Sequence, residues 1–353
     1  MQGIRVSFEE LRDFMDRAFR TAGLPDADAL TVATLMAEAE LQGSDGHGAI
    51  RLAPFLRRIR EGGVNKHPNI TVEREKPAMA LLNGDNAMGH LVMKRAAELA
   101  VEKAKTAGVA WVGAHLSNHA GPASLYARMA LPHDMIGLYM AVGNANHLPP
   151  WGGLTMLLST NPIACAVPTG KEPPVVLDMA TTVAAYGKVK AKAQRGEMMP
   201  EGWMIDRTGK PLLDPKRADE GFLLPIGGHK GYGLALIIGL LAGSLNGAAM
   251  GRDVIDFNSD FKSVGNTGQA MIAIDPAAFG DLDEFKAAVD LVVRDLRASE
   301  RMPGVERVWL PGEQSHEKRS ANQATGMPLP PQLKAVLDKT AADFAIEPLR
   351  VMQ

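Results

Sequence analysis

Apolar residues near the start of the chain recur every three or four positions. Leu11, Phe14, Met15, Ala18 and Phe19 follow this spacing, which is typical of an amphipathic helix. A capping box, a serine followed three positions later by a glutamate, precedes this run, and two adjacent glycines follow the third such segment. The pattern therefore predicts three helices, the first beginning after residue 7, the second spanning about 25–42 and the third 50–60.

From about Thr71 the pattern changes to short apolar runs that alternate with longer amphipathic ones. Such alternation is typical of an α/β body. Strands are predicted at 78–82, 109–114, 136–142, 163–167, 175–177 and 270–274, and helices at 90–107, 182–194, 232–245 and 282–298. A last helix is predicted at 331–344, after a polar stretch with glycine and proline, 311–330, in which no element is predicted.

The helical segments at the two ends of the chain are expected to pack together as one discontinuous domain. This interpretation places the two parts of the helical domain at residues 1–75 and 285–353, and the α/β body between them at 76–284. With 353 residues, of which 46% are hydrophobic and 22% charged, the chain is long enough to bury the cores of two domains.

Charge and apolar run length exclude two classes of partner. The 38 basic and 40 acidic residues give a formal net charge of -2, and no basic block is present, so no nucleic-acid partner is expected. The longest apolar run, 234–242, is too short to span a bilayer, and the N-terminus lacks the apolar stretch of a signal peptide. A single cysteine, Cys165, cannot form an internal disulfide. We therefore expect a cytoplasmic protein without a membrane partner.

The candidate chemistry begins with His47, which lies between two glycines and four residues before Arg51. If a helix begins near His47, both side chains fall on one face. An imidazole can exchange a proton near neutral pH, and a guanidinium can grip a carboxylate through two hydrogen bonds. The pair suits a small carboxylic acid whose neighbouring carbon is oxidised or reduced. A helix-start or packing histidine and a solvated arginine are the plainer alternatives.

Three further segments place polar residues at the ends of apolar runs. His119 follows a predicted strand, where ligands gather in open α/β sheets, although a lone loop histidine is commonly a packing residue. Asp178 follows another strand and can orient a histidine, accept bonds from a sugar hydroxyl, or cap a helix. His229 and Lys230, among glycines, can meet a phosphate where a helix begins, or be solvated charges in a turn.

The standard signatures of other site classes are missing from the sequence. No Gly-x-Gly-x-x-Gly follows a strand and no phosphate loop is present, so a dinucleotide enzyme with this sequence is not a Rossmann one. His47, Asp45, His119 and His147 are suitable metal ligands by type, but none has zinc-site spacing, and no metal is expected. No Gly-x-Ser-x-Gly elbow indicates a serine hydrolase.

Taken together, seven segments resemble the non-Rossmann malate/L-lactate dehydrogenase family. This group includes sulfolactate, ureidoglycolate and diketogulonate dehydrogenases and the reductases of piperideine- or pyrroline-2-carboxylate. The segments are Gln42-Gly43-Ser44-Asp45-Gly46-His47-Gly48-Ala49-Ile50-Arg51, Ser117-Asn118-His119-Ala120-Gly121, Pro150-Trp151-Gly152-Gly153, Ser159-Thr160-Asn161-Pro162, Leu177-Asp178-Met179-Ala180-Thr181-Thr182, Pro200-Glu201-Gly202-Trp203 and Gly227-Gly228-His229-Lys230-Gly231-Tyr232-Gly233-Leu234. The resemblance implies a homodimer with an α/β, mixed-sheet nicotinamide-binding body, a helical domain from both chain ends, and active sites near the subunit boundary.

The resemblance also implies roles for individual residues. The proton donor corresponds to His47 or, as in ureidoglycolate dehydrogenases, to His119; we favour His47. In the imine reductases the residue matching Asp178 is paired with the catalytic histidine. The cofactor, NAD or NADP, is expected to contact Asp178, Met179, Ala180, Thr182, His229, Lys230, Gly312, Glu313 and Gln314.

The sequence departs from the family pattern at Gly46, where the family usually has serine, so a serine relay to His47 is missing here. We predict an NAD(P)-dependent oxidoreductase that moves hydride to or from the α-carbon of a small 2-oxo or 2-hydroxy acid, with Arg51 holding the carboxylate and the pKa of His47 near the working pH. One alternative is reduction of a cyclic imine carboxylate, because Gly228-His229-Lys230-Gly231 is closer to the imine reductases. The other is a dinucleotide-binding sensor without turnover.

Overall fold

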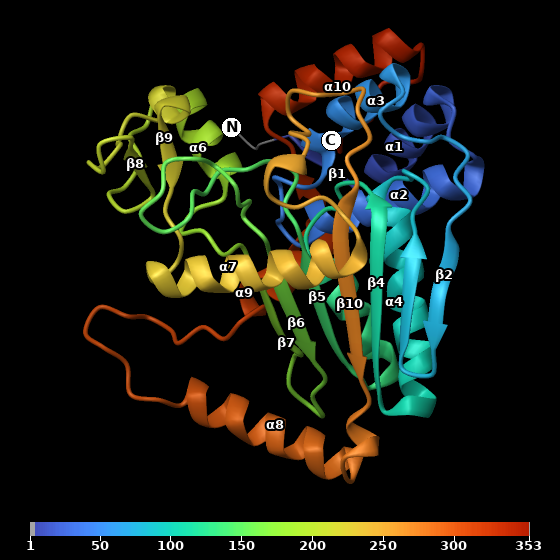
Figure 1. The fold of residues 1–353 in the computed structure, drawn as a ribbon, viewed down its shortest axis with the longest axis vertical. Helices are drawn as coiled ribbons and strands as arrows, with labels where there is room; N and C mark the ends of the chain where they lie inside the picture. Colours follow the sequence, from blue (N-terminus) through green and yellow to red (C-terminus); the bar gives the residue numbers. More distant parts are fainter. Residues whose placement is uncertain (1–3, 353) are drawn as a thin grey trace.

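A seven-stranded sheet forms the centre of the computed structural model, which describes residues 4–352 (Figure 1). The strand order is β2 (Thr71–Lys76), β3 (Met79–Asn83), β4 (Val109–Ser117), β10 (Thr267–Ile274), β5 (Ile136–Ala141), β6 (Ile163–Val167) and β7 (Val175–Met179). Only β3 and β4 pair in parallel, and every other neighbouring pair in this sheet is antiparallel. The sheet is therefore mixed, which confirms the predicted non-Rossmann α/β class.

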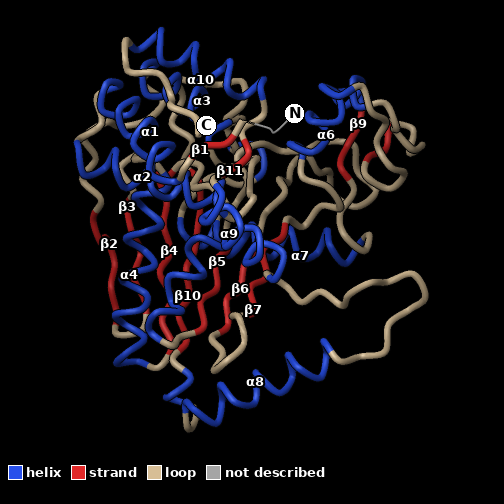
Figure 2. Tube along the Cα trace, turned by 180° about the vertical axis from the view of Figure 1, so that it is seen from behind, coloured by secondary structure: helices blue, strands red, loops and turns tan. Residues whose placement is uncertain are grey.

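Helices cover both faces of the sheet. On one face α4 (Gly89–Ala107) packs its alanines and valines against β4 and β10, together with α5 (Ser124–Ala127). On the other face α7 (His229–Ala242) contacts Met140 and Ile272 through Ile238 and Ala242. Figures 1 and 2 show the sheet between these two helices. The small alanine side chains let α4 lie close to the strands.

The two ends of the chain share a second core. It joins α1 (Phe8–Ala22), α2 (Asp26–Leu41), α3 (Leu52–Glu61) and α10 (Pro331–Phe344), and β1 (Arg5–Val6) pairs with β11 (Met327–Pro328) beside them. The capping box forms, because Ser7 Oγ accepts from the Glu10 amide at 3.2 Å. Gly62, at φ 88°, ends α3 in the left-handed region that favours glycine.

Two parts extend from the central body (Figure 1). One contains α6 (Tyr186–Arg195), β8 (Met204–Asp206) and β9 (Gly221–Leu223) around a small core of its own. The other is α8 (Leu282–Arg297), which lies at the far end of the sheet and is followed by a long loop. The predicted boundary between the α/β body and the C-terminal part of the helical domain, at residue 285, falls inside α8.

Most predicted elements are present, and the structure adds others, namely the short elements β1, α5, β8, β9 and β11 and the longer β2 and α9 (Glu313–Thr325). The strand β2 is fully exposed and polar, and α9 occupies the stretch in which no element is predicted. Short 3-10 turns complete the chain: η1 (Ala49–Arg51), η2 (Arg128–His133), η3 (Pro215–Glu220), η4 (Ser244–Asn246), η5 (Gly251–Asp253) and η6 (Pro276–Ala278). Across residues 4–352, no helix is both long enough and apolar enough to cross a membrane.

Candidate active site

His47 lies in the turn between α2 and η1, before any helix begins. The helical segment begins two residues after it, since η1 starts at Ala49 and α3 continues from Leu52. Arg51 nevertheless lies close, since its Nε donates to the carbonyl of Gly46 at 2.8 Å. The side chain folds back over the turn that carries His47, and its remaining guanidinium nitrogens make no other hydrogen bond within residues 4–352.

The structure brings His47 and His119 into direct contact. His47 Nδ1 lies 3.3 Å from His119 Nε2, although the residues are 72 positions apart. The two rings are parallel within 6°, with centroids 5.3 Å apart. His119 comes from the loop after β4, and His47 comes from the helical layer. The site therefore joins the two cores of the molecule.

Apolar and neutral rings enclose this pair. Phe55 and Phe257 lie against His119, with ring centroids at 5.8 and 5.5 Å, and Phe55 also contacts His90 edge-on. Burial, with the charge of Arg51, lowers the pKa of His47 to about 4, and burial lowers that of His90 to about 3. Burial also holds the pKa of His119 well below its usual range. In the free protein the pKa of His47 therefore lies below the near-neutral value expected from the sequence, because the ring is partly buried and a cation is near.

The hydrogen bonds assign the ring protons of the pair. The amide of Gly121 donates to His119 Nδ1 at 3.4 Å, so a neutral His119 carries its proton on Nε2. That proton is donated to His47 Nδ1, which leaves the proton of His47 on Nε2. His47 therefore presents an Nε2–H group on the side away from His119.

The loop that carries His119 is held at both ends. Asn118 Nδ2 donates to Asn86 Oδ1 and to the Ala87 carbonyl, each at 2.9 Å. Tyr126 donates to the Ala120 carbonyl at 2.5 Å. Asp178, at the end of β7, accepts from the Ser124 amide at 2.8 Å. The carboxylate thus caps the short helix α5, and no hydrogen bond joins it to a histidine within residues 4–352.

The segments expected to contact a dinucleotide follow one another along β7. At the start of this strand, the Val176 amide donates to the Pro311 carbonyl at 3.0 Å, which places the loop containing 312–314 beside it. After the strand, the Ile226 amide donates to the Thr181 carbonyl at 3.0 Å, which places the loop before α7 beside 178–182. Through Asp178 this edge is also tied to the loop of His119.

The N-terminus of α7 offers a second feature that fits a dinucleotide. The helix begins at His229, and its cap residue Gly228 offers no side chain to the first amides, so within the described part of the chain they are available to an anion. Gly228 precedes it at φ 65°, and a Cβ there would lie 3.3 Å from Trp151. The half-exposed Trp151 ring approaches this backbone because glycine leaves the space. A phosphate at the helix end and an extended ligand along β7 are compatible with these contacts.

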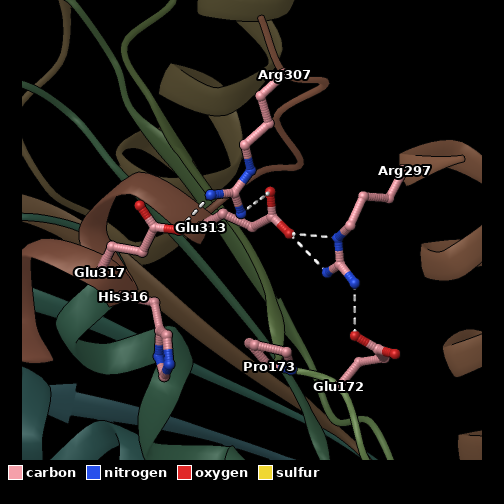
Figure 3. Close-up of a pocket in the computed structure, with 7 residues that line it drawn as sticks. All are labelled: Glu172, Pro173, Arg297, Arg307, Glu313, His316 and Glu317. Atoms are coloured by element: carbon pink, nitrogen blue, oxygen red, sulfur yellow. Dashed lines mark hydrogen bonds and ion pairs between the residues drawn. The ribbon is translucent and has the colours of Figure 1, made fainter. Parts of the chain in front are cut away.

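Glu313 differs from the other candidate cofactor residues because arginines of its own chain surround its carboxylate (Figure 3). Arg297 donates to it at 2.7 Å, Arg307 at 3.4 Å and the Leu310 amide at 3.1 Å. Arg297 also pairs with Glu172 at 2.8 Å. Glu313, the two arginines and Glu172 line a cavity of about 300 Å³ with Pro173, His316 and Glu317. The network fixes the start of α9, and Gln314 remains exposed beside it.

Sequence reasoning missed three groups of the site. His90 is fully buried, and within residues 4–352 neither of its ring nitrogens has a hydrogen-bond partner. Arg58 is buried as well and donates to the carbonyls of Gly63 and Ser263, which holds the segment of Phe257 against the histidines. Glu40 lies under the His47 turn. Only a charge inside a predicted apolar helix face could have signalled Arg58.

Comparison with known proteins identifies the family. A family model described as malate/L-lactate dehydrogenase matches residues 6–338. Malate dehydrogenase of Pyrococcus horikoshii is 37% identical over 98% of this chain and 97% of its own length. L-sulfolactate dehydrogenase of Methanothermobacter thermautotrophicus is 39% identical over 84% of this chain and 86% of its own. The solved sulfolactate dehydrogenase of Methanocaldococcus jannaschii superposes with a TM-score of 0.90 at 33% identity, covering 98% of each chain.

The family model covers most of the chain, and the relatives match it over most of their own length. The chain therefore belongs to the malate/L-lactate dehydrogenase family and is a nicotinamide-dependent oxidoreductase of the 2-hydroxy acid class.

Proposed function

We propose that this protein moves hydride between NAD(P) and the α-carbon of a small 2-oxo or 2-hydroxy acid, with His47 exchanging the proton. The hydrogen bond between His47 and His119, beside Arg51, carries this proposal. Bound nicotinamide supplies the hydride in reduction and accepts it in oxidation. The neighbouring oxygen of the substrate must then gain or lose a proton, and His47 presents an Nε2–H group that the hydrogen bonds of the pair leave available for it.

Arg51 binds the substrate carboxylate in this proposal. Its Nε is held by the Gly46 carbonyl, which leaves the other guanidinium nitrogens for a paired contact with a carboxylate. The bound anion also reduces the effect of the Arg51 charge on His47. Because that charge contributes to the low pKa of His47, substrate binding raises this pKa toward the working pH.

His119 delivers the proton to His47. In reduction, a proton taken up from solvent at His119 Nδ1 replaces the 3.4 Å hydrogen bond from the Gly121 amide and moves the Nε2 proton of His119 to His47 Nδ1. The Nε2 proton of His47 then passes to the substrate oxygen, and both rings end neutral with their protons on Nδ1. This route needs no serine at position 46, where this chain has glycine. Oxidation runs the same transfers in reverse.

The cofactor contacts and the assembly are further parts of the proposal. Asp178, Met179, Ala180, Thr182, His229, Lys230, Gly312, Glu313 and Gln314 are the candidate NAD or NADP contacts, and their position along β7 and at the start of α7 supports them. We also place the protein in the cytoplasm, with a small carboxylate as its substrate, and expect a homodimer. Exposed apolar residues on α7 support the dimer: Leu234, Ile237 and Leu240.

A cyclic imine carboxylate is the second candidate substrate. The observation that favours it is His229 at the start of α7, in a tetrapeptide like that of the imine reductases. A protonated imine already carries its positive charge, so His47 has less proton donation to perform.

A substrate panel tests the proposed reaction. The protein is incubated with NADH or NADPH and with each of several 2-oxo acids and five- or six-membered cyclic imine carboxylates, and the loss of reduced-nicotinamide absorbance is recorded. We expect turnover of at least one 2-oxo acid. Faster turnover of imines would assign the second candidate, and cofactor binding without any turnover would indicate a sensor instead.

A further inference from the structure

A buried acid, Glu40, lies directly under the turn that carries His47. It belongs to the last turn of α2 and is only 8% exposed. Its Oε1 accepts a hydrogen bond from the Ala49 amide at 2.9 Å. A Cβ on Gly48 would overlap the Glu40 side chain and lie 2.8 Å from Oε1. The carboxyl group therefore touches both residues that follow His47.

No cation explains the burial of Glu40. Within residues 4–352 it forms no ion pair, whereas Glu38 on the same helix pairs with Arg319 of α9 at 2.6 Å. The charge that acts on Glu40 is that of Asp45, an acid of the His47 turn, whereas the charge of Lys318 on α9 acts on Asp45. Burial, with the charge of Asp45, raises the pKa of Glu40 to about 8. Near neutral pH the group is mostly an uncharged acid, and its carbonyl oxygen still accepts from an amide.

The hydrogen bond of Glu40 connects it to both proposed functional side chains. Ala49 is the first residue of η1 and Arg51 is the last, so fixing the Ala49 amide fixes the start of the 3-10 turn that presents Arg51. Gly48 joins this turn to His47. Its backbone passes so close to the Glu40 carboxyl group that a Cβ would overlap it. The glycine is required here because any side chain would displace Glu40.

We infer that Glu40 is the positioning residue of the site: through the Ala49 amide and the Gly48 backbone it sets His47 against His119 and Arg51 toward the substrate. This role rests on the proposed function. It involves no contact between Glu40 and the substrate. The proposed role needs a side chain long enough to accept a hydrogen bond from the Ala49 amide. It does not need a negative charge.

Three substitutions distinguish the loss of the hydrogen-bond acceptor from the loss of the titratable group and from a nonspecific effect of changing α2. Glu40→Gln keeps an oxygen acceptor and removes titration, Glu40→Leu removes the acceptor, and Glu38→Gln is the matched control on the same helix. We expect Glu40→Leu to lower kcat/KM for the best panel substrate about 10- to 100-fold, because it leaves the buried Ala49 amide without an acceptor and displaces the site. The Kd of the cofactor should change less than about twofold. Glu40→Gln is expected to stay within about threefold of wild type, as is Glu38→Gln.

A substrate-independent measurement accompanies the kinetics. Nitrogen NMR of the histidine rings reports their protonation, and we expect the His47 and His119 signals to match a hydrogen-bonded pair in wild type, Glu40→Gln and Glu38→Gln, and to shift in Glu40→Leu. Wild-type signals and kcat/KM in Glu40→Leu, or equal losses in Glu40→Gln and Glu40→Leu, would overturn the role of Glu40. A wild-type protein without turnover, whose ring signals still depend on Glu40, would instead overturn the proposed reaction alone.

A second variant covers the case in which Glu40→Leu does not fold. Gly48→Ala introduces the Cβ that overlaps Glu40, and we expect kcat/KM to fall at least about tenfold with the cofactor Kd unchanged. Wild-type kcat/KM in Gly48→Ala would overturn the inference, because the turn would then tolerate displacement from Glu40.

Discussion

The pKa values of the two histidines of the candidate site are lowered by burial and by the nearby Arg51 charge, so both rings are neutral in the free protein. His47 lies beside Arg51, and aromatic rings surround His119. Each ring therefore carries one proton, and the hydrogen bond between them decides where it is. The hydrogen-bonded pair can pass a proton from one ring to the other. In the proposed reaction it runs from His119 to His47 in reduction and the other way in oxidation.

The pH dependence of reduction follows from the low pKa of His47. Reduction needs a protonated pair, and the pKa of His47 is about 4 before substrate binds. We expect kcat/KM for a 2-oxo acid to fall as pH rises from 6 to 8, by about tenfold per unit, whereas kcat changes at a higher pH because the bound carboxylate raises the pKa. Initial rates at saturating cofactor measure both profiles. A kcat/KM that stays flat over this range would contradict the assignment.

Arg51 is expected to act on substrate binding. Glutamine in its place removes the charged partner of the carboxylate, so Arg51→Gln should raise KM about 10- to 100-fold, the value of one or two charge-assisted hydrogen bonds. Arg51→Lys should restore only part of this loss, because an ammonium group lacks the planar fork. The cofactor Kd, from fluorescence titration, serves as the control. An unchanged KM in Arg51→Gln would remove the proposed role.

At the residue scale the sequence identifies candidates but not their partners. His47 and Arg51 stand out by spacing, and His119 by its place after a strand. The contact of His47 with His119 depends on how the helical layer meets the sheet, which no local pattern encodes. His90 and Glu40 lie inside helices and look like any other polar residue there, so only their burial reveals them.

Among the elements, local signals predict those that bury an apolar face. The capping box of α1 and the glycine after α3 place their ends correctly, and β6 spans the predicted residues. In contrast, α9 has almost no apolar residue, and its helix is held by polar contacts with α2. Arg319 pairs with Glu38 at 2.6 Å, and Asn322 donates to the Leu41 carbonyl at 3.0 Å. Such tertiary contacts produce no apolar periodicity in the sequence from which the helix could be predicted.

The strand β2 was missed for a related reason. All six of its residues are exposed, and it lies at the edge of the sheet, where charged side chains are common. Alternation of apolar and polar positions, the usual signal of a strand, is therefore weak here. Its pairing with β3 supplies the hydrogen bonds that stabilise it.

The whole molecule leaves an apolar surface on α7 that its own chain does not cover. Ile237 is 52% exposed and Leu240 is 42% exposed, on the face turned away from the sheet. Because monomeric proteins rarely expose such a helix face, we assign it to the interface of the proposed homodimer. The candidate cofactor residues at the start of α7 then lie near the boundary between subunits.

Charge on this face tests the dimer. We expect the wild-type protein to elute with about twice its 37.7 kDa mass in size-exclusion chromatography with light scattering, and the double variant Ile237→Glu/Leu240→Glu to elute as a monomer. Leu30→Glu, a similar change at an exposed position of α2, is the control and should leave the mass unchanged. A double variant that keeps the dimeric mass would place the interface elsewhere.

The proton role of His47 is tested most directly by single-turnover hydride transfer in His47→Gln. With reduced cofactor bound and a panel substrate in excess, stopped-flow absorbance should show a rate about 10²- to 10⁴-fold below wild type, while the cofactor Kd changes less than about twofold. Glutamine keeps a polar side chain in the turn but cannot relay a proton. Hydride transfer at the wild-type rate in His47→Gln would contradict the account.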